Sequence, residues 1–152
     1  MKKENEYYFA GMFLAIAALG RIAMEPLPSV EPIIPIAVYV ALKKGSEAGM
    51  IVGGFAYIVS NIFMNGGLGF WTWMQALGGA GAALFAASYG KEKISMPALL
   101  GLTFIGTIIF ETVMNAGYGE LLVWPFSYVH IASNLIFAAV IGSSITSKEK
   151  KE

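Results

Sequence analysis

The sequence predicts an all-α membrane protein, folded as a compact bundle of six transmembrane helices with both termini in the cytoplasm. Hydrophobic residues make up 57% of the chain and charged residues only 13%, and the mean hydropathy is +0.65. Soluble domains contain about a quarter charged residues, so this composition favours a membrane protein. A helix that crosses the hydrocarbon needs about 20 mostly apolar residues. Six spans would therefore occupy most of the 152 residues, and we expect residues 1–152 to form a single integral membrane domain.

Six apolar runs mark the expected helices. They lie at about 7–24, 32–43, 46–64, 71–90, 96–116 and 121–145. The first run lacks a small-residue cleavage site and leads into a polar, proline-rich loop, so we expect a retained helix and not a cleaved signal. The second run is too short to span a bilayer alone, and Pro26, Pro28, Pro32 and Pro35 precede or begin it. We expect extended chain before this helix, and a helix that is tilted or partly buried by its neighbours.

The next runs carry signals of helix packing and of a helix start. Small residues recur every four positions in the third and fourth runs, at Gly45, Gly49, Gly53, Gly78, Ala82 and Ala86. Such ridges let helix backbones approach closely inside a membrane. Ser95 suits the N-cap of the fifth helix and Pro97 suits its first turn.

The lysines predict the orientation of the bundle. With six spans, all nine fall on one side: Lys2, Lys3, Lys43, Lys44, Lys91, Lys93, Lys148, Lys150 and Lys151. The connections at 25–31, 65–70 and 117–120 contain none. Because positive charge gathers on the cytoplasmic side, we expect a multi-pass protein of the cell membrane with both termini inside.

Polar side chains gather at one depth, near the outer ends of five helices. The candidates are Arg21, Asn61, Gln75, Glu111, Asn115, Tyr128, His130 and Asn134. Partners four residues apart share a helix face, and ionised side chains that face lipid cost a few kcal/mol, about 2.5–3.5 on insertion scales. These faces should therefore turn inward around a wet cavity open to the outside. Above it lie aromatic, glycine-rich loops at 66–73 and 117–119, where Trp71 or Trp73 could stack on a ligand and a lid could form.

Each candidate also has a purely structural interpretation. Trp71, Trp73 and Trp124 fit the interfacial aromatic belt. Arg21 could extend to the interface or pair with Glu25. His130 could hydrogen-bond a neighbouring carbonyl, and Glu111 could form a structural pair with Arg21 or His130. Glu25, Glu31 and Glu120 are interpreted as solvated loop charges.

Several function classes lack their signatures. The chain has no phosphate-binding glycine loop followed by lysine, so it cannot use ATP by itself. One histidine and no cysteine argue against a catalytic zinc or haem site, so we expect no metal and no cofactor. No basic surface suggests nucleic-acid binding. We expect a protein that is not an enzyme, with two alternatives: a small membrane enzyme using Glu111 and His130 as acid and base, or a stand-alone facilitator.

Three stretches resemble a known family, the S components of energy-coupling factor (ECF) transporters. They are ALGRIAMEPLPSVEPIIP at 17–35, GLGFWTWMQALGGAGAAL at 67–84 and YVHIASNLIFAAVIGSSI at 128–145. The shared features are a proline-rich first loop, tryptophans where the fourth helix begins and a polar start to the sixth.

The resemblance implies a capture subunit without catalysis. Family members hold a vitamin or related nutrient in an outward-facing pocket, and they deliver it through a transmembrane coupling protein that carries two ATPases. Docking in the family uses small residues, typically two alanines four apart on the first helix. Here Gly11, Ala15 and Ala18 could form that face, although Leu19 departs from the pattern. In such a pocket Trp71 or Trp73 would stack, Arg21 would meet an anionic group, and the other polar candidates would supply hydrogen bonds.

Overall fold

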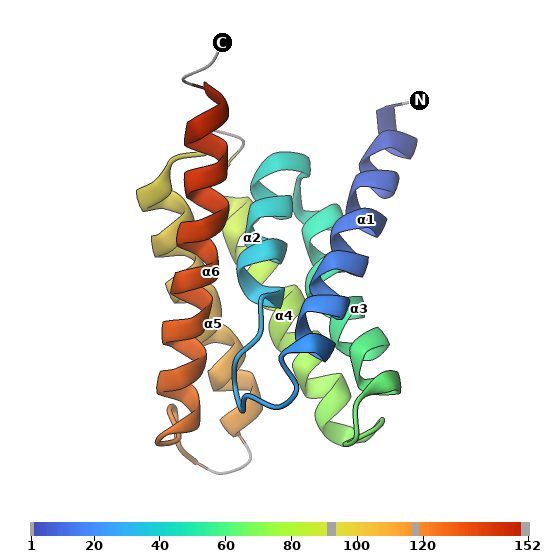
Figure 1. Ribbon diagram of the computed structural model, residues 1–152, viewed down its shortest axis with the longest axis vertical. Coiled ribbons are helices and arrows are strands. Elements are labelled where there is room, and N and C mark those ends of the chain that lie inside the picture. The colour runs from blue at the N-terminus through green and yellow to red at the C-terminus, as the bar shows by residue number, and fades with distance from the viewer. Residues whose placement is uncertain (1, 91–93, 117–118, 150–152) are drawn as a thin grey trace.

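A computed structural model describes residues 2–90, 94–116 and 119–149, which form six α-helices (Figure 1). They are α1 (Lys2–Ala23), α2 (Ile33–Lys44), α3 (Ser46–Phe63), α4 (Phe70–Ser88), α5 (Met96–Asn115) and α6 (Phe126–Glu149). The prediction of an all-helical chain is confirmed for these residues. Six residues that entered the orientation and lid predictions lie outside the described ranges: Lys91, Lys93, Gly117, Tyr118, Lys150 and Lys151.

Four helices, α1, α3, α5 and α6, are long and apolar enough to cross a membrane. Their outer surfaces carry large apolar side chains, for example Leu19, Phe63 and Ile136, which are 66%, 70% and 65% exposed. Apolar surface of this extent marks a lipid or protein contact. The composition, the helices and their outer surface are all consistent with an integral membrane protein.

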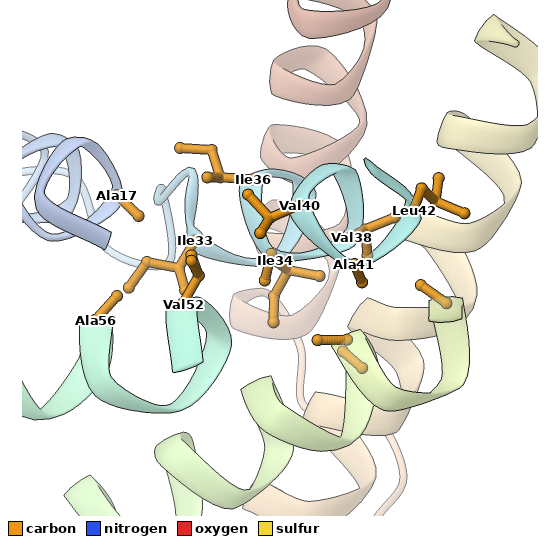
Figure 2. Close-up of a cluster of buried hydrophobic side chains, with 14 of the residues drawn as sticks. Ala17, Ile33, Ile34, Ile36, Val38, Val40, Ala41, Leu42, Val52 and Ala56 are labelled. Atoms are coloured by element: carbon orange, nitrogen blue, oxygen red, sulfur yellow. The ribbon is translucent and has the colours of Figure 1, made fainter. Parts of the chain in front are cut away.

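The short helix α2 occupies the centre of the bundle. It has 12 residues, of which nine are buried, and it packs against each of the other five helices. At 1.5 Å per residue it is about 18 Å long, well short of the ~30 Å hydrocarbon core. Figure 2 shows its Ile33 beside Val52 and Ala56 of α3. The expected second helix is therefore a core helix enclosed by its neighbours.

Glycines allow a close contact between the backbones of α3 and α4. A Cβ atom on Gly53 would lie 2.3 Å from the carbonyl oxygen of Gly79, and one on Gly79 would lie 2.1 Å from that of Gly53. Real Cβ atoms do not approach so closely, so only glycine fits at either position. The neighbouring Gly49 packs in the same way on Ala41 of α2.

The starts of α5 and α6 illustrate where local signals succeed and fail. Ser95 caps α5, accepting a hydrogen bond at Oγ from the Ala98 amide at 3.3 Å, as the sequence predicts. Helix α6 was expected from residue 121 but begins at Phe126. Pro125 disfavours helical backbone in the residue before it, so the apolar residues 121–124 form a connection instead.

The helix ends define two ends of the bundle. The first turn of α1, the α2–α3 connection and the last turn of α6 lie at one end, with Lys43 and Lys44 in the last turn of α2 (Figure 1). The α1–α2 and α3–α4 connections lie at the other, which we call the lysine-free end. Because α2 begins only at Ile33, residues 24–32 fill part of the space below it.

Candidate functional site

A cavity of about 550 Å³ opens at the lysine-free end of the bundle. Its wall comes from the end of α1, the α1–α2 connection, α4, the last turns of α5 and residues 120–130. Small-molecule sites commonly measure about 300–1,000 Å³, so the cavity has the size of a ligand site. Five residues of the predicted site line this cavity: Arg21, Gln75, Glu111, Asn115 and His130.

Arg21, in the last turn of α1, is held by side chains of α3 and of the α1–α2 connection. Its Nε donates to Glu31 Oε2 at 2.6 Å, and its Nη1 donates to Asn61 Oδ1 at 2.6 Å and to Ser60 Oγ at 2.8 Å. The guanidinium also lies over the ring of Tyr57, 5.2 Å from its centroid. With only 8% of its surface exposed, Arg21 does not extend to the interface. It pairs with Glu31 and not with the expected Glu25, whose carboxylate accepts from the Asn65 amide.

Glu31 corrects one prediction, because it is not a solvated loop charge. It is 8% exposed, and its carboxylate accepts hydrogen bonds from Arg21, Tyr57 and His130. Burial alone would raise the pKa of Glu31, but the His130 hydrogen bond and the charges of His130 and Arg21 lower it to about 2. Glu31 is therefore a carboxylate at neutral pH.

His130, in the second turn of α6, bridges two carboxylates. Its Nε2 lies 3.1 Å from Glu31 Oε1 and its Nδ1 lies 2.6 Å from Glu111 Oε1. Carboxylates only accept hydrogen bonds, so an imidazolium that donates from both nitrogens satisfies both contacts. Its ring meets Phe110 edge-on, with 5.0 Å between centroids. The sequence left two structural partners open for Glu111, Arg21 or His130, and in the structure Glu111 pairs with His130.

The second oxygen of Glu111 joins α5 to the start of α6. Glu111 Oε2 accepts from Ser127 Oγ, and from Asn115 Nδ2 at 3.2 Å. Asn115 Nδ2 also lies 3.2 Å from the Leu121 carbonyl, so it holds the α5–α6 connection against the helix end. One continuous polar network thus runs from Arg21 through Glu31 and His130 to Glu111.

Asn61 and Gln75 extend this network to α3 and α4. Asn61 Nδ2 donates to Gln75 Oε1 at 2.8 Å and to Thr72 Oγ1 at 2.9 Å, while its Oδ1 accepts from Arg21. Gln75 lines the cavity, whereas Asn61 is not part of the wall and orients Arg21 and Gln75 from behind.

The other predicted residues lie elsewhere. Trp71, Trp73 and Tyr128 are 46%, 65% and 49% exposed, and none of them lines the cavity. Tyr128 instead meets Trp124 on the outside, with 5.2 Å between ring centroids. Asn134 is fully buried, and it donates to Thr107 Oγ1 at 3.2 Å, away from the cavity.

The expected docking face on α1 is not continuous. Gly11 and Ala15 are exposed, and a Cβ atom on Gly11 would meet nothing within 4 Å. Ala18 is 2% exposed and belongs to the hydrophobic core, so it does not share their surface.

Sequence reasoning missed Glu31 and several other wall residues. Ser29, Phe110, Met114 and Ser127 also line the cavity. Ser127 precedes His130 by three residues and Phe110 precedes Glu111, so helical spacing and adjacency were available signals. For Glu31 the one sequence signal is a charge directly before Pro32 and the core helix.

The arrangement suits binding by hydrogen bonds. Within the described ranges, no group of three or more His, Asp or Glu side chains is placed to hold a metal ion.

Comparisons with protein-family models, with curated proteins and with solved structures found no match to this chain.

Proposed function

We propose that this chain is a membrane-embedded capture protein for a small polar nutrient, the role of an ECF-type S component. The observation that carries the proposal is a cavity of about 550 Å³ at one end of the bundle, with an ordered polar wall. Arg21, Glu31, His130 and Glu111 hold one another in place, so little side-chain ordering remains to be done when a ligand binds.

The proposed setting follows from the helices and the lysines. The chain lies in the cell membrane, with both termini in the cytoplasm and the cavity facing outward. It hands its vitamin-like ligand to a transmembrane coupling protein with two ATPase subunits, since its sequence contains no phosphate-binding glycine loop followed by lysine. Co-purification of such a complex from the native membrane is the test of these partners.

The geometry of His130 argues against the enzyme alternative. An acid–base pair needs a ring nitrogen that can exchange a proton with the substrate. In this chain both ring nitrogens are engaged by carboxylates, at 2.6 Å and 3.1 Å. The facilitator alternative requires a polar path through the bundle, whereas the buried, apolar helix α2 fills its centre.

Mass spectrometry of small molecules retained by the protein tests the capture function. The protein is purified gently from its own host, and we expect one unaltered small molecule per chain to be released on denaturation. Glu111→Gln should reduce retention at least about tenfold, because it weakens charged hydrogen bonds in the cavity wall. Thr112→Val is the matched control, since Thr112 is exposed on the same helix and, among the described residues, its hydroxyl bonds only the Ile108 carbonyl. Equal retention by both variants, or release of a chemically altered molecule, would contradict the proposal.

A further inference from the structure

The charges of the cavity wall are paired within the chain. Arg21 Nε lies 2.6 Å from Glu31 Oε2, and His130 Nδ1 lies 2.6 Å from Glu111 Oε1. An imidazolium and a guanidinium thus face two carboxylates, and these four groups sum to zero. Arg21 was expected to meet an anionic group of the ligand, but the anion that it meets is Glu31.

Glu120 adds a negative charge that no cation of the wall offsets. It lines the cavity and is exposed, and the described part of the chain offers it neither a hydrogen bond nor an ion pair. The wall therefore carries a net negative charge even with His130 protonated. A ligand anion would be repelled by Glu120 and would find no unpaired cation.

The hydrogen-bonding groups that remain free differ between the two sides of the wall. On the α1 and α4 side, Arg21 Nη2 and Gln75 Nε2 are donors without a partner among the described residues. Both are held there by Asn61, which bonds Arg21 Nη1 and Gln75 Oε1. On the α5 side, Asn115 Oδ1 and the Glu120 carboxylate are acceptors that no donor of the described residues satisfies, and both residues line the cavity. The wall is thus a donor on one side and an acceptor on the other.

The rest of the wall is apolar. Phe110 and Met114 of α5 line the cavity together with Val123 and Phe126 from the α5–α6 region. Flat or aliphatic ligand surface that packs against such side chains is removed from water, which favours binding. The polar groups then fix the orientation of the ligand.

We propose that the cavity selects a neutral or cationic ligand that has a hydrogen-bond acceptor at one end and an amino-type donor at the other. This inference rests on the proposed capture function and names the class of molecule captured. The acceptor, a carbonyl or ring nitrogen, bonds Arg21 Nη2 and Gln75 Nε2. The donor bonds Asn115 Oδ1 and Glu120. Anionic molecules of the same size bind more weakly.

Three probes of one shape and different charge test the charge preference. They are 4-methylbenzylamine, 4-methylbenzyl alcohol and 4-methylbenzoate, which are cationic, neutral and anionic at pH 7. Binding to the full chain in nanodiscs of zwitterionic lipid is measured by ligand-observed NMR, with empty nanodiscs as the correction for partitioning. We expect the carboxylate to bind on the order of tenfold more weakly than the amine, as one unpaired charge a few Å away requires.

Glu120→Gln is the matched variant, because it removes the unpaired charge and keeps the side-chain size. It should lower the ratio of amine to carboxylate affinity several-fold, because both terms of that ratio depend on the charge of Glu120. Tightest binding by the carboxylate, or an unaltered ratio in Glu120→Gln, would overturn the inference.

The molecule retained from the native host separates this inference from the capture function. Retention of a neutral or cationic molecule supports both. Retention of a net anion leaves the capture function standing and overturns the charge preference. If the chain retains nothing and binds none of the three probes, the capture function itself fails and the inference fails with it.

Discussion

Replacing Glu31 with glutamine tests the buried polar network at its centre. The substitution keeps the size of the side chain but removes the charge that faces Arg21 and His130. An amide also places N–H donors where three donors, from Arg21, Tyr57 and His130, already point. Glu31→Gln should therefore destabilise the fold as well as disturb the cavity wall.

The buried ion pair and the lowered pKa of Glu31 each indicate the size of the effect. Removing one partner of a buried ion pair costs about 3–5 kcal/mol. A pKa lowered from 4.5 to about 2 corresponds to about 3 kcal/mol in favour of the folded carboxylate. Because the folded pKa is the lower one, this contribution is present above pH 4.5 and is lost as the pH falls toward 2.

Thermal unfolding in detergent or nanodiscs, followed by tryptophan fluorescence, measures the loss. For a chain of this length, ~3 kcal/mol lowers the midpoint by about 6–12 °C. Glu25→Gln is the matched control in the same connection, since its carboxylate bonds one backbone amide near the surface, and its midpoint should move by only a few °C. Equal midpoints for Glu31→Gln and the native chain at pH 7 would refute the buried charge network.

Two further substitutions probe the packing of the helices. Gly79→Ala should lower the unfolding midpoint sharply, because its methyl group would lie 2.1 Å from the Gly53 carbonyl oxygen. Gly11→Ala is the control, since its methyl group meets open space and should leave the midpoint unchanged. Equal midpoints for the two variants would contradict the close contact of α3 and α4. Thr103→Val should keep the free energy of unfolding or raise it by up to about 1 kcal/mol, because the fully buried Thr103 Oγ1 has no hydrogen-bond partner among the described residues. A clear loss of stability in the same assay would reveal a partner for this hydroxyl.

The sequence predicted the helices and the polar end of the bundle better than it predicted the site itself. Arg21, Gln75, Glu111, Asn115 and His130 line the cavity because helical spacing and the cost of ionised groups in lipid both turn such residues inward. These two rules act locally and need no knowledge of how the helices cross.

The failures have a common physical cause. Trp71 and Trp73 belong to a suitable region of the chain, but they lie in the first turn of α4, at the end of the helix, and both side chains are exposed. Glu31 lies in a loop, where no periodicity predicts burial. Its place beside Arg21 and His130 depends on the path of residues 24–32 between α1 and α2. Such tertiary features are absent from any local pattern.

The contact between Gly53 and Gly79 also bears on how the molecule can move. Two backbones that touch, with no side chain between them, have no rotamers through which to slide, so α3 and α4 should move as one rigid body. Rearrangement during ligand entry would then involve the other parts of the cavity wall, such as residues 24–32 and the start of α6. Distance measurements between spin labels should find a constant separation of α3 and α4, while the distances from this pair to the other parts of the cavity wall vary.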